Sequence, residues 1–177
     1  FSSARGFVFI EDLAPDAMEL RRSMIETDPP EHTRLRRLVS PMFTPKAIEA
    51  YRETARGVAR RLLDSAFERG EFDWATDVCE PMPIRVFIKI MGIDESDADF
   101  LAQTANQLVT VDDPDLAPPP AAYARALDRG FEPRHLPFRS PAALELFEYG
   151  HAIAAERRAD PRDDLVSKLV HTEIDGE

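Results

Sequence analysis

The sequence feature that most constrains the fold is the segment Asp-Pro-Pro-Glu-His-Thr-Arg-Leu-Arg-Arg-Leu-Val at residues 28–39. It predicts a helix from about Pro29 to Ser40. Asp28 can cap the first amides, proline is tolerated in the first turn, and Glu31 stands at the capping-box distance. At about 100° per residue, such a helix gathers one stripe of side chains with apolar neighbours beside it. The stripe is His32, Arg36, Val39 and Phe43, and its neighbours are Leu35, Leu38 and Met42.

His32 and Arg36 therefore share an edge of the face that we expect to be buried. Donor groups on a buried edge need an anion opposite them, because an unpaired buried donor is costly. Arg34 and Arg37 point elsewhere on the same helix. The alternative is that His32 and Arg36 are ordinary surface residues that pair with nearby acids or extend into water.

Residues that start and stop helices divide the rest of the chain into further helices. The clearest candidate runs from Pro45, after the cap residue Thr44, to a stop at Gly70. The other helices are expected over residues 15–25, 77–91, 94–109, 121–127, 141–158 and 165–170. The helix over 77–91 is apolar on most sides, which is typical of a buried helix. A proline-rich connection over 112–120 is either a packed lid or a linker. The predicted fold class is mainly α.

Composition excludes several classes of protein. The net charge of −11 argues against nucleic acid as the main partner. No apolar run approaches the roughly 20 residues of a membrane-spanning helix. Cys79 is the only cysteine, so no internal disulfide can form and a cytoplasmic location is expected. The chain begins without Met and ends in a turn-like sequence, so we predict that residues 1–177 form a single incomplete domain, an internal fragment of a larger one.

The 28–39 segment and the Ser-Pro-Met-Phe-Thr-Pro that follows it resemble helix C of the bacterial cytochromes P-450, the heme-thiolate monooxygenases. The order of the remaining helices is similar to helices D, E, F, G and H of that family. The resemblance implies a partial cytochrome P-450 fold, covering about helices B′/C to H and lacking the I helix and the Cys-ligand loop. In the family, a His-x-x-x-Arg of helix C hydrogen-bonds the heme propionates, and His32 and Arg36 match those positions.

Further expectations follow from the resemblance. The full-length protein would use heme b, dioxygen and two electrons to hydroxylate a hydrophobic small molecule of terpenoid, steroid or alkyl type. Its electron donor would be a ferredoxin-type protein, for which Arg34 and Arg37 could form a docking patch; the alternative is that both are solvated surface charges. The region before helix C and the F–G region, here roughly 108–144, would enclose the substrate. The residues expected to line this pocket are Phe7, Val8, Ile10, Leu108 and Val109; the alternative for the apolar run at residues 7–10 is a core strand.

The residues that carry the family's chemistry are not in this sequence. It lacks the acid–Thr pair of the I helix, the Glu-x-x-Arg of the K helix and the glycine-rich loop around the ligand cysteine. Cys79 has neither the glycines nor the Phe of that loop, so it is not the iron ligand, and we expect a small core residue there. No catalytic residue and no metal ligand is therefore predicted in the fragment, which alone should be inactive.

Two other functions compete with this enzyme. One is a heme-free helical module that binds an apolar ligand, and the other is an interaction domain without a small-molecule site. The donor pair His32 and Arg36 on an apolar helix edge favours the enzyme over both.

Overall fold

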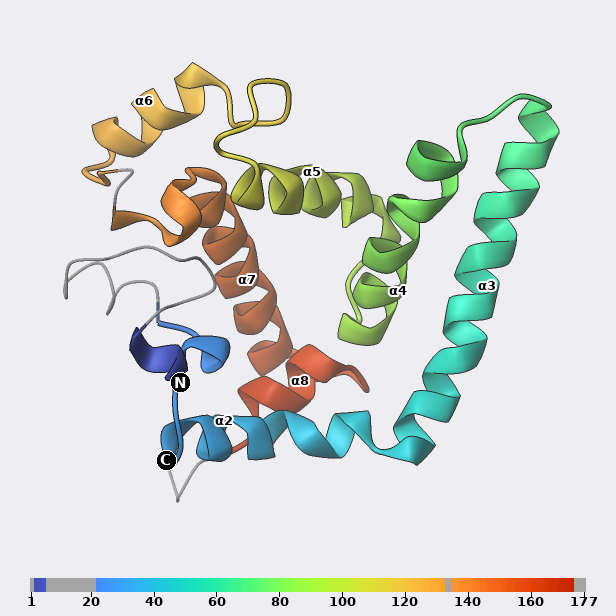
Figure 1. The fold of residues 1–177 in the computed structure, drawn as a ribbon. Coiled ribbons are helices and arrows are strands. Elements are labelled where there is room, and N and C mark those ends of the chain that lie inside the picture. Colours follow the sequence, from blue (N-terminus) through green and yellow to red (C-terminus); the bar gives the residue numbers. More distant parts are fainter. Residues whose placement is uncertain (1, 6–21, 133–134, 174–177) are drawn as a thin grey trace. The chain divides into compact units, whose positions relative to one another are not determined.

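The computed structural model describes residues 2–5, 22–132 and 135–173 (Figure 1). Throughout these ranges the regular structure is helical, as predicted, and no strand occurs. The chain divides into two compact units, each built from two segments. Unit 1 comprises Phe1–Val39 and Gln103–His151, and unit 2 comprises Ser40–Ala102 and Ala152–Glu177.

The elements of each unit are as follows. In unit 1 they are η1 (Ser3–Arg5), η2 (Met24–Glu26), α2 (Glu31–Val39), α6 (Pro120–Asp128) and η7 (Pro137–Arg139). In unit 2 they are η3 (Ser40–Phe43), α3 (Pro45–Arg69), η4 (Ala75–Cys79), α4 (Pro81–Met91), η5 (Glu95–Asp97) and α8 (Leu165–Val170). Two helices, α5 (Ala98–Val109) and α7 (Ala142–Ala159), contribute residues to both units.

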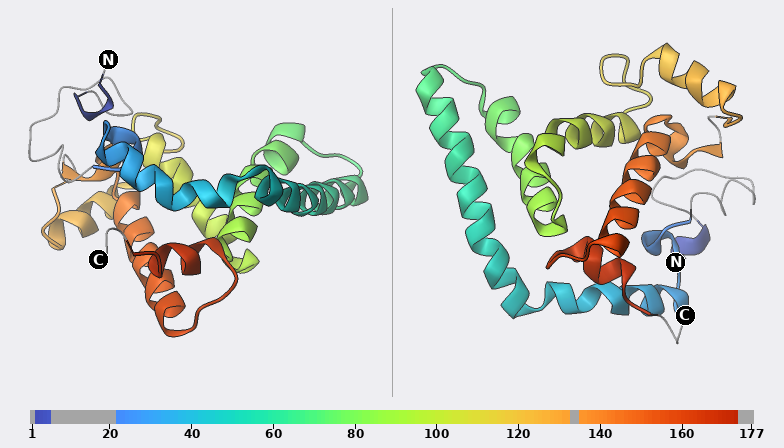
Figure 2. Two further views of the ribbon diagram at one scale, coloured as in Figure 1. Left: turned by 90° about the horizontal axis from the view of Figure 1, so that it is seen from below. Right: turned by 180° about the vertical axis from the view of Figure 1, so that it is seen from behind.

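The long helix α3 has the boundaries that its sequence predicts. The side chain of Thr44 accepts a hydrogen bond from the Ala47 amide at 3.3 Å, and Pro45 occupies the first turn. The helix stops at Gly70, whose φ of 77° is easily adopted only without a Cβ. Helices α3 and α4 lie side by side, as Figures 1 and 2 show, and bury Val58, Ala66 and Ile88 in unit 2.

The single helix predicted over 77–91 is divided in the structure. A π-helical turn, η4, ends at Cys79, and α4 begins anew at Pro81 because proline lacks the N–H that a continuous helix would need. The expectation that this segment is buried on all sides is also wrong. Ile88 is fully buried, but Phe87 is 49% exposed, because the neighbours of α4 within unit 2 leave that side of the helix uncovered.

A buried ion pair fixes the end of α7 to the start of α8 in unit 2. Arg157 is 1% exposed; its Nε donates to Asp164 Oδ2 at 2.6 Å and its Nη2 donates to the Gly92 carbonyl at 2.6 Å. The other Asp164 oxygen accepts from the Ser167 amide at 2.7 Å and so caps α8. Gly92 has a φ of 73°, and a Cβ there would lie 2.2 Å from the Asp164 Cβ. We call Arg157, Asp164 and Gly92 the buried clamp.

The proline-rich connection in unit 1 is an ordered series of turns. The Thr110 hydroxyl donates to the Asn106 carbonyl at 2.7 Å, and the Ala117 amide donates to the Asp113 carbonyl at 2.8 Å. After this connection, Ser140 is fully buried and its hydroxyl donates to the Gln107 carbonyl at 2.8 Å. The start of α7 is therefore tied to the end of α5.

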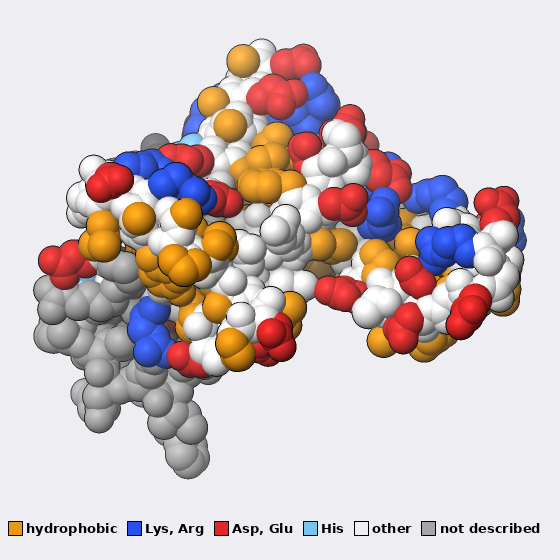
Figure 3. All heavy atoms as spheres, turned by 90° about the horizontal axis from the view of Figure 1, so that it is seen from above, with side chains coloured by type: hydrophobic (Ala, Val, Ile, Leu, Met, Phe, Trp, Pro, Cys, Tyr) orange, Lys and Arg blue, Asp and Glu red, His pale blue; other side chains and the backbone are white. Residues whose placement is uncertain are grey.

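Many large apolar side chains of the described residues are exposed, and Figure 3 shows some of them among charged groups. They are Ile25, Phe43, Ile48, Phe67, Trp74, Phe87, Phe100, Val109, Leu116, Leu127, Phe131 and Phe147. No described helix combines the length and the apolar character needed to cross a membrane.

Candidate functional site

The helix α2 carries the two residues for which the sequence predicts anion binding. His32, Leu35, Leu38 and Val39 are half-buried, whereas Arg36 is exposed and no residue of α2 is fully buried. His32 thus lies on the partly buried side of the helix, as predicted. Arg36 was predicted to share that buried edge, and this prediction is wrong. Arg36 lies about 40° beyond His32 on the side away from the leucines, where a long guanidinium side chain can stay in water.

The first turn of α2 differs from the predicted capping box. The helix begins at Glu31 rather than Pro29. The Asp28 carboxylate instead accepts hydrogen bonds from the Ser2 hydroxyl and, at 2.9 Å, from the Ser3 amide. These two hydrogen bonds lower the pKa of Asp28 below its ordinary value. The backbone carbonyl of Asp28 accepts from the His32 amide at 3.0 Å and so closes the first turn.

Helix α2 carries several exposed cationic side chains. Arg34 and Arg37 are both exposed, and Arg34 Nη1 lies 3.9 Å from Glu31 Oε2. His32 and Arg36, one turn apart, present imidazole and guanidinium N–H groups, which are the donors that suit carboxylates. The donor set therefore fits a ligand with two carboxylates, such as the propionates of a heme.

The residues predicted to line a substrate pocket are only partly described. Phe7, Val8 and Ile10 lie outside the described residues. Leu108 is half-buried and Val109 is 54% exposed, both at the C-terminal end of α5. Their place in one pocket with the first three residues stays a prediction.

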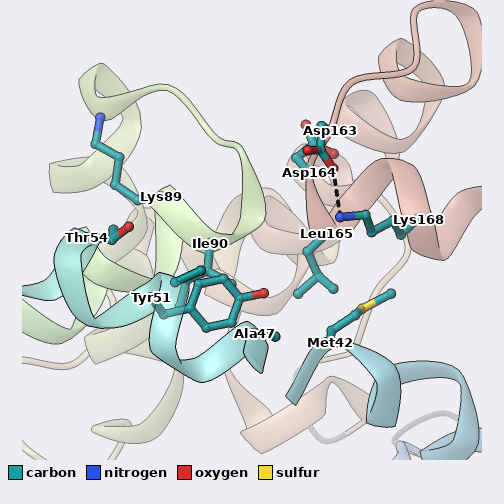
Figure 4. Close-up of a pocket in the computed structure, with 11 residues that line it drawn as sticks. Met42, Ala47, Tyr51, Thr54, Lys89, Ile90, Asp163, Asp164, Leu165 and Lys168 are labelled. Atoms are coloured by element: carbon teal, nitrogen blue, oxygen red, sulfur yellow. Dashed lines mark ion pairs between the residues drawn. The ribbon is translucent and has the colours of Figure 1, made fainter. Parts of the chain in front are cut away.

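Unit 2 contains a pocket that the sequence did not predict (Figure 4). Its volume is about 370 Å³. The lining residues are Met42, Ala47, Ala50, Tyr51, Thr54, Lys89, Ile90, Asp163, Asp164, Leu165 and Lys168. Tyr51 lies on α3 and Leu165 on α8, and only tertiary structure could show that these helices leave space between them.

Polar groups stand at the edge of this pocket. Lys168 Nζ lies 2.8 Å from Asp163 Oδ1, and this hydrogen bond raises the pKa of Lys168. Lys89 points away from the other labelled side chains in Figure 4, and its Nζ lies 2.9 Å from Glu95 Oε2. The pocket thus combines an apolar wall with charged groups that are already paired.

Cys79 lies at the end of η4 and is exposed, so the prediction of a small core residue is wrong. The helix break between η4 and α4 explains the difference, since Cys79 is not part of the apolar helix to which it was assigned. Within the described ranges, no group of three or more His, Cys, Asp or Glu side chains is placed to hold a metal ion.

Curated proteins similar to this chain are bacterial monooxygenases. The chain is 32% identical over 169 residues to a steroid C26-monooxygenase of Rhodococcus jostii. It is 30% identical over 173 residues to a methyl-branched lipid omega-hydroxylase of Mycobacterium tuberculosis. These matches include 95% and 96% of this chain but 32% and 37% of the relatives. The chain therefore spans about a third of their length.

Solved structures of cytochromes P-450 share its fold. A cytochrome P-450 of Mycobacterium marinum in complex with pseudoionone matches with a TM-score of 0.75 and 31% identity, over 99% of this chain and 39% of that one. The cytochrome P-450 of the Bacillus subtilis bacillaene polyketide synthase matches with a TM-score of 0.70 and 28% identity, over 93% and 37%. No protein-family model matches. The chain belongs to the cytochrome P-450 family and represents part of its fold, and the complete fold carries heme.

Proposed function

We propose that this chain is the part of a heme-dependent monooxygenase that holds the heme propionates and contributes to the cover of a hydrophobic substrate. The observation that carries the proposal is an identity of about 30% to two bacterial monooxygenases along nearly the whole chain. The donor pair on α2 supports it independently. Residues 1–177 then form one incomplete domain of a longer protein, and the enzyme activity belongs to that full-length protein.

His32 and Arg36 are the residues proposed to hold the heme. The guanidinium of Arg36 can donate hydrogen bonds to one carboxylate, and the half-buried imidazole of His32 can donate a hydrogen bond to the second. Together they neutralise the propionates and fix the orientation of the macrocycle. Neither residue touches dioxygen, so both are binding residues and no catalytic residue is proposed within the chain.

The chemistry comes from the cofactor. Heme with a cysteine thiolate ligand supplies the activation of dioxygen, by which one oxygen atom enters a C–H bond of the substrate and the other leaves as water, with two electrons and two protons consumed. We propose that the thiolate comes from outside these 177 residues, because Cys79 lacks the surroundings of a ligand loop.

The proposed substrate is a hydrophobic small molecule of terpenoid, steroid or alkyl type. The names of the relatives support this class, since one acts on a steroid and another on a methyl-branched lipid. Leu108 and Val109, with Phe7, Val8 and Ile10, are the proposed lining residues. Absorbance titration of the heme-loaded protein with pseudoionone, a steroid and a branched fatty acid would rank the three types.

The proposed electron donor is a ferredoxin-type protein in the cytoplasm. Arg34 and Arg37 are exposed on α2 and would attract its acidic surface. Replacing both with Ala should lower ferredoxin-supported turnover, most strongly at low salt, and leave heme content unchanged. If this double variant turned over as fast as the wild type at low salt, the assignment of Arg34 and Arg37 to a docking patch would be wrong.

The heme assignment is tested by replacing both His32 and Arg36 with Ala in the full-length protein. Each charge-assisted hydrogen bond is worth about 1.5–3 kcal/mol, so heme should transfer to apomyoglobin at least about tenfold faster. The Arg34→Ala, Arg37→Ala double variant is the matched control, since it also removes two side chains from α2. Undiminished heme retention in the first variant would contradict the assignment, and absence of a thiolate-type band with reduced iron and carbon monoxide would reject the monooxygenase.

One observation favours the alternative, a heme-free ligand-binding or interaction module. The pocket of unit 2 has a volume within the range of small-molecule sites. A full-length protein that binds pseudoionone without heme would support this module.

A further inference from the structure

Asp28 forms hydrogen bonds in two directions, through its side chain and through its backbone. Its carboxylate accepts from the Ser2 hydroxyl and, at 2.9 Å, from the amide of Ser3, the first residue of η1. Its backbone carbonyl accepts from the His32 amide at 3.0 Å. Asp28 therefore joins η1, which begins 25 residues earlier in the chain, to the first turn of α2.

The backbone on both sides of Asp28 is held in place. Before it, Thr27 is 5% exposed and its hydroxyl donates to the Met24 carbonyl at 2.7 Å. The element that ends there, η2, is in backbone contact with both η1 and α2 (Figure 1). After it, Pro29 and Pro30 have a φ fixed by their rings, so few backbone angles separate Asp28 from α2. A displacement of Asp28 is therefore passed on to the start of this helix.

The placement of His32 depends on this junction. His32 is the second residue of α2, and the first amides of a helix have no acceptor within the helix. No residue of α2 is fully buried, so packing gives its first turn little protection against fraying. The Asp28 carbonyl supplies an acceptor for the His32 amide. The position of the half-buried imidazole thus follows from the position of the Asp28 backbone.

We propose that Asp28 is a positioning residue for heme. Its carboxylate holds η1, its carbonyl holds the His32 amide, and the two together fix the His32 imidazole for a propionate. The role toward heme rests on the proposed function, whereas the junction between η1 and α2 does not. A competing explanation is that the negative charge of Asp28 acts only on the positive end of the helix dipole.

The junction is tested by hydrogen–deuterium exchange of the η1 amides and the His32 amide in the full-length protein. In Asp28→Ala both should exchange about three- to tenfold faster, the effect of losing roughly one hydrogen bond's net stabilisation. Asp28→Asn should stay close to the wild type, because its amide oxygen still accepts from Ser3 although the charge is gone. Wild-type exchange of the His32 amide in Asp28→Ala would overturn the junction.

The matched control is Glu31→Ala. Glu31 lies in the same first turn and its Oε2 is 3.9 Å from Arg34 Nη1, so the variant removes an equal charge without touching η1. Exchange of the η1 amides should stay as in the wild type. If Glu31→Ala speeds the η1 and His32 amides as much as Asp28→Ala does, or if Asp28→Asn behaves like Asp28→Ala, charge is responsible and the junction is refuted.

The positioning role needs a second readout, the rate of heme transfer to apomyoglobin. Asp28→Ala should speed transfer about three- to tenfold in the wild type and have no further effect in His32→Ala, because it acts through His32. An equal effect in both backgrounds would overturn the positioning role and leave a general loss of stability. If His32→Ala itself transfers heme at the wild-type rate, the heme assignment of the proposed function fails, and the exchange experiment still decides the junction.

Discussion

The two ends of α7 both carry arginine–carboxylate pairs, but in opposite surroundings. The buried clamp near its C-terminus places Arg157 and Asp164 at 2% and 6% side-chain exposure, with every described partner in unit 2. The pairs Arg125–Glu145 and Arg129–Glu148 near its N-terminus, in unit 1, leave all four side chains in contact with water. A buried pair must be complete because a lone charge there has no solvent, whereas an exposed pair can open at little cost. The buried pair therefore fixes structure, whereas the exposed pairs contribute little to it.

The largest expected effect in this comparison is the loss of Arg157. Arg157→Ala leaves the Asp164 carboxylate buried without its partner, and we expect the full-length protein to lose about 3–5 kcal/mol of unfolding free energy. Urea denaturation followed by circular dichroism measures the loss. Arg158→Ala, an exposed neighbour on the same helix, is the control and should stay within about 0.5 kcal/mol of the wild type. Similar values for the two variants would refute the distinction between buried and exposed pairs.

The substitution Gly92→Ala tests the buried clamp at its backbone member. The new Cβ would meet Asp164 at 2.2 Å in a conformation that L residues avoid, so we expect a loss of about 1–3 kcal/mol. Gly150→Ala offers the opposite case, because it lies within α7 with nothing within 4 Å of the added Cβ. It should raise stability by about 0.5–1 kcal/mol. A melting temperature of Gly92→Ala that equals or exceeds that of the wild type would show that the clamp tolerates displacement.

Acid should weaken the clamp in a defined pH range. Burial alone would raise the pKa of Asp164, but hydrogen bonds from the Ser167 amide and the Arg157 side chain outweigh it, so the pKa lies below its ordinary value of 3.8. The folded state therefore takes up the proton less readily than the unfolded state. The stabilisation is complete above about pH 4 and is lost as the pH falls through the folded pKa.

The measurement is the difference in urea midpoint between the wild type and Asp164→Asn. This difference should be constant from about pH 7 to pH 5 and shrink below pH 4. A difference that grows on acidification would mean that the pKa is raised rather than lowered.

The smallest expected effect belongs to the exposed pair Arg125–Glu145. Arg125→Ala should cost about 0.2–1 kcal/mol of unfolding free energy at low salt and nearly nothing in 0.5 M NaCl, because both partners are exposed. Chemical denaturation at the two salt concentrations measures it. A loss that persists at high salt would indicate packing of the Arg125 stem rather than a charge interaction.

Sequence reasoning located the helices well where local chemistry decides them. Thr44, Pro45 and Gly70 bound α3 as predicted, since caps and stops act within a few residues. It misjudged positions that depend on distant segments. Phe87 and Cys79 were expected to be buried because their neighbours are apolar, but exposure depends on what packs against a helix and not on its own composition.

What the sequence by itself determined is the family resemblance and the pair His32 and Arg36, because a helix places residues four apart on one side whatever surrounds it. Tertiary structure alone decided that Arg36 is exposed, that Arg157 contacts Asp164 and Gly92, and that Arg125 pairs with Glu145. These features depend on contacts between segments as far as 65 residues apart in the chain. Local propensity carries no information about such contacts, because they arise only when the helices pack.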